Sequence, residues 1–107
     1  MTLLRGFGAL DVEAQLDTYA EDATVITADR VYRGKDEIRD YIEGFVAEFS
    51  QEGISMETDM FLFEGKIGLV VWSGDSPQNS YDFASDTYVV EDGKIVSHTF
   101  AAKVTPK

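Results

Sequence analysis

The second half of the sequence is an almost continuous series of strand-like segments, and this feature constrains the fold more than any other. Between residues 54 and 104, four segments rich in β-branched and aromatic residues are separated by the short turn sequences "EGK" at 64–66, "SPQNS" at 76–80 and "EDG" at 91–93. Turns this short join antiparallel neighbours, because parallel strands need a much longer crossover. We therefore predict a four-stranded antiparallel meander.

The first half of the sequence predicts helices and one small strand pair. The segment "KDEIRDYIEGFVAEFS" at 35–50 has acidic residues in its first turn, where the helix dipole favours them, and an apolar stripe at helical spacing formed by Ile38, Tyr41, Ile42, Phe45 and Phe49. A second helix is predicted to begin after the N-cap residue Asp11 and to reach Tyr19 or Ala20, and another begins at Thr2. The segment "TVITADRVYRG" alternates like two short strands.

Helices followed by strands predict an α+β fold, in which helices pack on one face of a curved antiparallel sheet. Such a sheet wraps around its helices and can leave a pocket at the open end, which is the default position for a binding site. The chain has 107 residues, of which 44% are hydrophobic, and this is enough for one core. We expect one domain over residues 1–107.

The charge balance and the missing residue types exclude several functions. Twenty acidic residues outnumber nine basic ones, so the net charge of −11 repels nucleic acids and anionic membranes. The sequence has no cysteine and one histidine, which leaves few metal ligands, and it has no glycine-rich phosphate loop. We expect no metal, no cofactor, no nucleic acid or membrane partner, and a cytoplasmic protein.

The chain's single histidine lies in a segment that also carries a candidate acid. In "FASDTYVVEDGKIVSHTF", Asp86 and His98 stand on either side of the predicted turn. A carboxylate beside an imidazole orients the ring and supports general acid or base chemistry near neutral pH. This chemistry requires that both side chains project from the same face of the sheet.

The length of the turn decides whether they do. With a two-residue type I′ turn, Glu91 pairs with Lys94, and Asp86 and His98 project from opposite faces. With a three-residue turn, Val90 pairs with Lys94, and Asp86 lies directly opposite His98. Apolar residues next to the turn occupy both faces of the hairpin, so the hydrophobic pattern leaves both registers open.

Several segments together resemble a known family. The stretches "LDTYAEDATVIT", "VYRGKDEIRDYI" and "VVWSGDSP", followed by "FASDTYVVEDGKIVSHTFAAKV", are similar to SnoaL-like proteins of the nuclear transport factor 2-like superfamily, from about Leu10 to Val104. The resemblance implies a cone-shaped α+β fold with a cavity between sheet and helices, and often a dimer formed through the outer face of the sheet. This fold hosts many unrelated activities. The first helix is shorter here than is usual in the family.

Ketosteroid isomerase, a member of this superfamily, allows a residue-by-residue test of one enzyme activity. Its aspartate base works with a tyrosine and a protonated aspartic acid. The base position falls on Thr27 and the tyrosine position near Leu3, neither of which can do this chemistry, whereas Asp86 matches the protonated acid. The resemblance therefore disfavours steroid isomerisation by that mechanism. It favours the three-residue turn, because the isomerase counterpart of His98 lines the cavity.

Aromatic residues are predicted to form most of the cavity wall, and they suit a small, mostly apolar organic ligand. The candidates for ligand contact are Tyr19, Tyr41, Phe45, Trp72, Tyr88 and Phe100, with Asp86 and His98 as candidate catalytic residues. Two functions remain open. The protein is either a small-molecule-binding domain or a general acid/base enzyme of isomerase, cyclase or dehydratase type that acts on a small carbonyl or polyketide-like substrate.

The strands are also expected to form a homodimer. Residues 66–104 carry more apolar side chains than one cavity face can cover. Twofold association through the outer face of the sheet is the commonest solution.

Overall fold

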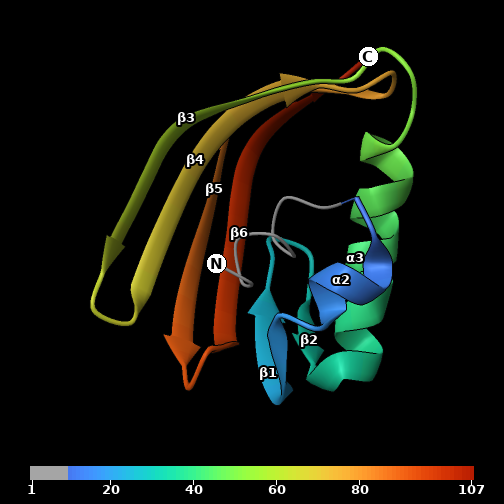
Figure 1. Cartoon of the computed structure of the whole chain (residues 1–107). Helices are drawn as coiled ribbons and strands as arrows, with labels where there is room; N and C mark the ends of the chain where they lie inside the picture. The colour runs from blue at the N-terminus through green and yellow to red at the C-terminus, as the bar shows by residue number, and fades with distance from the viewer. Residues whose placement is uncertain (1–9) are drawn as a thin grey trace.

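The computed structural model describes residues 10–107, which form a curved six-stranded sheet with helices on its concave side (Figure 1). The predicted helix that begins at Thr2 lies mostly outside the described residues. In chain order the elements are α2 (Val12–Leu16), β1 (Tyr19–Ile26), β2 (Val31–Arg33), α3 (Gly34–Phe49), β3 (Ser55–Glu64), β4 (Ile67–Asp75), β5 (Asn79–Glu91) and β6 (Lys94–Pro106). This arrangement confirms the predicted α+β class.

The strand order in the sheet is β2-β1-β6-β5-β4-β3. Strands β3 to β6 form the predicted antiparallel meander, and β1 and β2 form the predicted small pair. The pairing of β1 with β6 is parallel, which differs from the all-antiparallel expectation. It is possible because the chain between these two strands is long enough to cross over through α3 and the meander.

Helix α2 begins as predicted and ends earlier. The Asp11 side chain accepts a hydrogen bond from the Ala14 backbone N–H at 3.1 Å, so the N-cap is confirmed. The helix ends at Leu16, however, and Tyr19 and Ala20 belong to β1. Their apparent helical spacing was misleading, because pairing of this segment with β6 outweighs a short local periodicity.

Helix α3 packs its apolar stripe onto the concave face of the sheet (Figure 1). Ile38, Ile42 and Phe49 are buried in the core. Tyr41 and Phe45, from the same stripe, are half-buried. The helix therefore seals one end of the space above the sheet and leaves two aromatic side chains at its border.

The C-terminal end of α3 is tied to the loop between β4 and β5 through Glu48. One carboxylate oxygen of Glu48 accepts hydrogen bonds from the Ser76 hydroxyl at 2.6 Å and the Asn79 side-chain amide at 2.9 Å. The other accepts from the Tyr81 hydroxyl at 2.7 Å. Partial burial acts to raise the pKa of Glu48, but these three hydrogen bonds outweigh it, and the pKa lies below its ordinary value.

The turn between β5 and β6 has two residues. Glu91 pairs with Lys94, and the two turn residues both have positive φ, 51° for Asp92 and 77° for Gly93, as a type I′ turn requires. The prediction of a three-residue turn was therefore wrong. The Asp-Gly sequence, which is the favoured type I′ pair, was the better guide to the turn than the family resemblance.

A β-bulge follows directly after this turn. Val90 pairs with Ile95, but Val89 pairs with Ser97, so Val96 is an extra residue in β6. The bulge shifts the pairing of β6 by one position from Ser97 to Lys103, until a second irregularity, between Tyr81 and Phe83 of β5, restores the register.

This shift brings Asp86 and His98 to the same face of the sheet. His98 pairs with Tyr88, and Asp86 pairs with Phe100, which makes Asp86 and His98 diagonal neighbours on adjacent strands. The two-residue turn alone would have separated them. The predicted proximity therefore holds, although by a different route from the one expected.

The outer face of the sheet is uncovered in the described chain (Figure 1). Strand alternation directs Met60, Leu62, Ile67 and Phe83 to this face, and all four are exposed large hydrophobic residues. Such a group of exposed apolar side chains is typical of an interaction surface.

Candidate functional site

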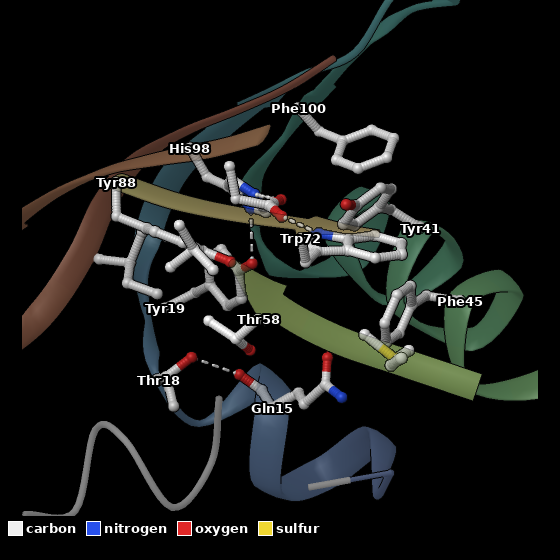
Figure 2. A pocket seen from close by; sticks show the side chains of 14 residues that line it. Gln15, Thr18, Tyr19, Tyr41, Phe45, Thr58, Trp72, Tyr88, His98 and Phe100 are labelled. Atoms are coloured by element: carbon white, nitrogen blue, oxygen red, sulfur yellow. Dashed lines mark hydrogen bonds and ion pairs between the residues drawn. The ribbon is translucent and has the colours of Figure 1, made fainter. Parts of the chain in front are cut away.

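A cavity of about 190 Å³ lies between the concave face of the sheet and helices α2 and α3. Figure 2 shows the side chains around it. They come from both helices, the turn between α2 and β1, and all strands except β2. The lining residues are Gln15, Thr18, Tyr19, Tyr41, Phe45, Met56, Thr58, Val70, Trp72, Asp86, Tyr88, Ile95, His98 and Phe100. The wall is therefore mostly apolar and aromatic, with a few polar groups.

A chain of hydrogen bonds joins four of these residues. The Tyr19 hydroxyl lies 2.8 Å from His98 Nδ1, and His98 Nε2 lies 2.6 Å from Asp86 Oδ1. The second carboxylate oxygen, Oδ2, accepts a hydrogen bond from Trp72 Nε1 at 2.9 Å. All four residues are buried, with exposed fractions of 8% or less. Each polar atom of the chain thus has a partner in a site that water hardly reaches.

The pattern of donors assigns the protons in this chain. Trp72 Nε1 can only donate, so it faces an acceptor oxygen of Asp86. Asp86 acts as a negative charge on the neighbouring tyrosines, and an ionised carboxylate can only accept, so His98 Nε2 carries the proton between them. The hydrogen bonds of Asp86 therefore fit an ionised carboxylate and not the protonated acid that the isomerase resemblance implies.

The remaining histidine nitrogen faces a tyrosine that keeps its proton. Burial, and then the negative charge of Asp86, raise the pKa of Tyr19 far above its ordinary value. With Nε2–H donating to Asp86, the neutral ring offers Nδ1 as an acceptor to the Tyr19 hydroxyl. His98 is thereby held in one tautomer between a carboxylate and a phenol.

Two further tyrosines enclose the imidazole. The Tyr88 ring stacks on His98 with 4.2 Å between ring centroids, and the Tyr41 ring meets it edge-on at 5.8 Å. Burial and the charge of Asp86 also raise the pKa of both hydroxyl groups. The histidine thus sits in a cage of aromatic rings whose hydroxyl groups stay protonated at neutral pH.

The structure brings all the sequence-predicted site residues around one cavity. The two candidate catalytic residues, Asp86 and His98, and the six candidate ligand contacts named above all line it. Their roles in binding or catalysis stay predictions. Thr27, which takes the place of the isomerase base, is outside the lining, and its side chain instead bonds to the backbone of Asp29 and Arg30 in the turn after β1.

Sequence reasoning missed the small and polar part of the lining. Gln15, Thr18, Met56, Thr58, Val70 and Ile95 also face the cavity. Strand parity could have found Thr58 and Val70, since Thr58 pairs with Trp72, and Val70 lies two residues before it. Gln15 and Thr18 carry no such signal, because their position at the cavity depends on where α2 ends.

Two further observations concern metals and membranes. Within residues 10–107 no group of three or more histidine, cysteine, aspartate or glutamate side chains is placed to hold a metal ion. No helix in this part of the chain is both long and apolar enough to cross a membrane.

The sequence matches the family model of the SnoaL-like domain over residues 2–98. The chain belongs to this SnoaL-like family. No curated protein is similar enough to the sequence to count as a match.

Solved structures extend the SnoaL-like assignment at the level of the fold. A nuclear transport factor 2-like protein of unknown function from Cytophaga hutchinsonii superposes with a TM-score of 0.74 at 14% identity, over 95% of this chain and 84% of the other. A putative polyketide cyclase from Sinorhizobium meliloti gives 0.68 at 19% identity, over 84% and 81%. The epoxide hydrolase/cyclase-like enzyme SalBIII, described in pyran ring formation of salinomycin, gives 0.77 at 19% identity, over 98% and 90%. At these identities the likeness of the SnoaL-like chain to each of them is one of fold.

Proposed function

We propose that this SnoaL-like protein binds a small, mostly apolar organic molecule in the cavity between the sheet and the helices. The observation that carries the proposal is the buried chain of hydrogen bonds from Tyr19 through His98 and Asp86 to Trp72, set at the border of an aromatic cavity. Apolar walls with a few fixed polar groups are the usual make-up of small-molecule sites. The cyclase-like names of two structural neighbours are compatible with such a ligand.

Trp72 provides the experiment, because it is the single tryptophan of the chain and lines the cavity. Its indole N–H gives one resolved NMR signal. We expect a saturable shift of this signal on titration with ethylbenzene, and loss of the shift in Thr58→Phe, which fills the cavity. Thr105→Phe, an exposed position at the end of β6, is the matched control and should bind as the wild type does. Binding that is absent in the wild type, or unchanged in Thr58→Phe, would count against the proposal.

General acid/base catalysis on a small carbonyl substrate is the second candidate. It is favoured by the hydrogen-bonded series Tyr19–His98–Asp86, which resembles the base-and-orienter arrangement of many enzymes. Nδ1 of His98 is occupied by Tyr19, so His98 can act as a base only when that hydroxyl moves aside. Binding is therefore the function that the geometry supports better.

Proton exchange tests this second candidate. We expect an enzyme of this kind to speed the exchange of the α-hydrogens of cyclohexanone with deuterated water, and His98→Gln to remove the effect. The measurement is the loss of the α-hydrogen NMR signals over time. If the α-hydrogens exchange no faster than in buffer alone, while the protein still binds ethylbenzene, the second candidate fails and binding remains the function.

The proposal includes a homodimer and a cytoplasmic location. The exposed apolar side chains of Met60, Leu62, Ile67 and Phe83 on the outer face of the sheet support self-association. The location remains a prediction from the sequence, as does the extent of a single domain over residues 1–107.

A further inference from the structure

The size of the cavity limits the ligand to one ring. A cavity of about 150 Å³ lined by aliphatic and aromatic side chains holds benzene, whereas sites for drug-sized molecules span about 300–1,000 Å³. The cavity here measures about 190 Å³. It therefore has room for a single six-membered ring with a small substituent and is too small to enclose a fused polycyclic compound.

Four polar side chains of the cavity wall are already engaged with one another. Tyr19, His98, Asp86 and Trp72 bond to one another. Tyr41 differs from them, because within residues 10–107 its hydroxyl makes no hydrogen bond to another residue. Figure 2 shows this hydroxyl pointing from α3 into the cavity.

Tyr41 is suited to donate a hydrogen bond and not to accept a proton. Burial, followed by the charge of Asp86 and the neighbouring tyrosines, raises its pKa well above the ordinary value, so the O–H stays intact at neutral pH. The intact O–H can therefore donate a hydrogen bond to an acceptor atom of a ligand, such as a carbonyl oxygen.

The charges around the cavity select a neutral acceptor. No lysine or arginine is among the lining residues of the described chain, and Asp86 contributes a negative charge close to His98 and Tyr41. The whole chain has a net charge of −11. A carboxylate or phenolate ligand would meet repulsion here without any compensating cation.

We infer that the ligand is a neutral single-ring carbonyl compound, whose oxygen accepts a hydrogen bond from Tyr41. This inference rests on the proposed binding function and specifies its ligand class. Tyr41 is then the residue that selects carbonyl compounds over hydrocarbons. The hydrogen bonds that link Tyr19, His98, Asp86 and Trp72 keep the surrounding side chains in place.

Four probes of graded chemistry test the inference through the Trp72 indole signal. Acetophenone is a neutral single-ring ketone, ethylbenzene has the same shape without the acceptor, benzoate is an anion of similar size, and 2-acetylnaphthalene adds a fused ring. We expect acetophenone to bind about 2- to 12-fold more tightly than ethylbenzene, which is the range for one neutral hydrogen bond. Benzoate should bind more weakly than acetophenone, and 2-acetylnaphthalene should give no saturable shift.

A substitution then assigns the effect to the hydroxyl. Tyr41→Phe should abolish the preference for acetophenone over ethylbenzene, and a saturable shift with ethylbenzene should remain, which shows that the cavity stays folded. Tyr32→Phe is the matched control, because Tyr32 packs against the Tyr41 ring but does not line the cavity. It should keep the preference.

The outcomes separate this inference from the proposed function. If no probe, ethylbenzene included, shifts the indole signal, binding itself fails. If ethylbenzene binds as tightly as acetophenone, if Tyr41→Phe keeps the preference, or if benzoate or 2-acetylnaphthalene binds as well as acetophenone, binding stands and the inferred ligand class is overturned.

Discussion

Asp86 serves two different donors with its two oxygen atoms, and this division governs the state of the histidine. Oδ2 accepts from the indole of Trp72, and Oδ1 accepts from His98. Because both donors are buried, removing either acceptor leaves a polar group without compensation. The carboxylate thus determines both where the indole points and which histidine nitrogen carries the proton.

We predict that Asp86→Asn reverses the tautomer of His98. The indole of Trp72 requires an acceptor, so the asparagine oxygen will face it and the amide N–H₂ will face Nε2. Nε2 must then accept, and the ring proton moves to Nδ1. Nitrogen-15 NMR at pH 8.5, where a free imidazole is neutral, should show Nε2–H in the wild type and Nδ1–H in the variant.

The same substitution should lower the free energy of unfolding by about 1.5 to 3 kcal/mol, the range for hydrogen bonds to a charged group. Asp59→Asn, at an exposed position of β3, is the control. It should change neither the tautomer of His98 nor the free energy of unfolding. A wild-type histidine already protonated at Nδ1 would contradict the assignment.

The sequence predicted which aromatic and catalytic candidates line the site, but not the hydrogen bonds that join them. Asp86 and Tyr88 share a face of one strand by parity, and the stripe with Tyr41 and Phe45 follows from helical spacing. The bond between Tyr19 and His98 joins residues 79 positions apart. It depends on the parallel pairing of β1 with β6, which no local sequence pattern predicts.

At the scale of elements, the junction between α3 and the β4–β5 loop rests on one acidic side chain. Glu48 accepts hydrogen bonds from Ser76, Asn79 and Tyr81, so three positions on the meander are tied to the end of the helix. The hydroxyl of Ser76 also accepts from the Asn79 backbone N–H at 3.1 Å. The loop conformation and the position of the helix therefore depend on each other.

We predict that this junction is sensitive to acid. Because its pKa is lowered on folding, Glu48 contributes stability above its unfolded value of about 4.5, and this contribution is lost as the pH falls through the lower folded value. Glu48→Gln should therefore reduce the free energy of unfolding by about 1 kcal/mol at pH 7. The difference from the wild type should narrow below pH 4.5, as measured by urea unfolding at several pH values.

Glu52→Gln is the matched control, because Glu52 is exposed just beyond the same helix. It should unfold as the wild type does at each pH. If the free energies of unfolding of Glu48→Gln and the wild type differed by the same amount down to pH 3, the hydrogen bonds would not depend on the charge of Glu48.

The elements themselves follow closely from the sequence, and the exceptions have physical causes. Turn residues and alternation predicted the extents of β3 to β6, and the acidic first turn predicted α3. The hydrophobic alternation did not reveal the extra residue Val96, since the neighbouring residues are apolar on both faces of the hairpin. A register is weakly specified wherever the pattern is two-sided.

At the scale of the whole molecule, strong negative charge opposes the proposed dimer. Two chains of −11 would meet at a face that carries Leu62, Ile67 and Phe83 as exposed apolar residues. Burial of these side chains favours association, while the like charges repel each other over a distance that salt shortens to about 10 Å at 0.1 M.

We predict that the dimer becomes tighter as salt is added. The dissociation constant from analytical ultracentrifugation should be lower at 0.5 M than at 0.05 M sodium chloride, because screening removes repulsion and leaves the apolar contact. Leu62→Glu should raise this constant by about 10- to 100-fold, from the loss of one buried leucine. Leu10→Glu, an exposed position before α2, should not change it.

The bulge at Val96 gives the hairpin one spare residue, and this has a consequence for how related sequences are compared. If one residue were deleted between Ile95 and Ser97, the strand could straighten, and Asp86 and His98 would still face the same side. We therefore expect evolution to tolerate hairpins one residue shorter without loss of the aspartate–histidine contact. A gap at this point in an alignment is then no sign that a relative has lost its site.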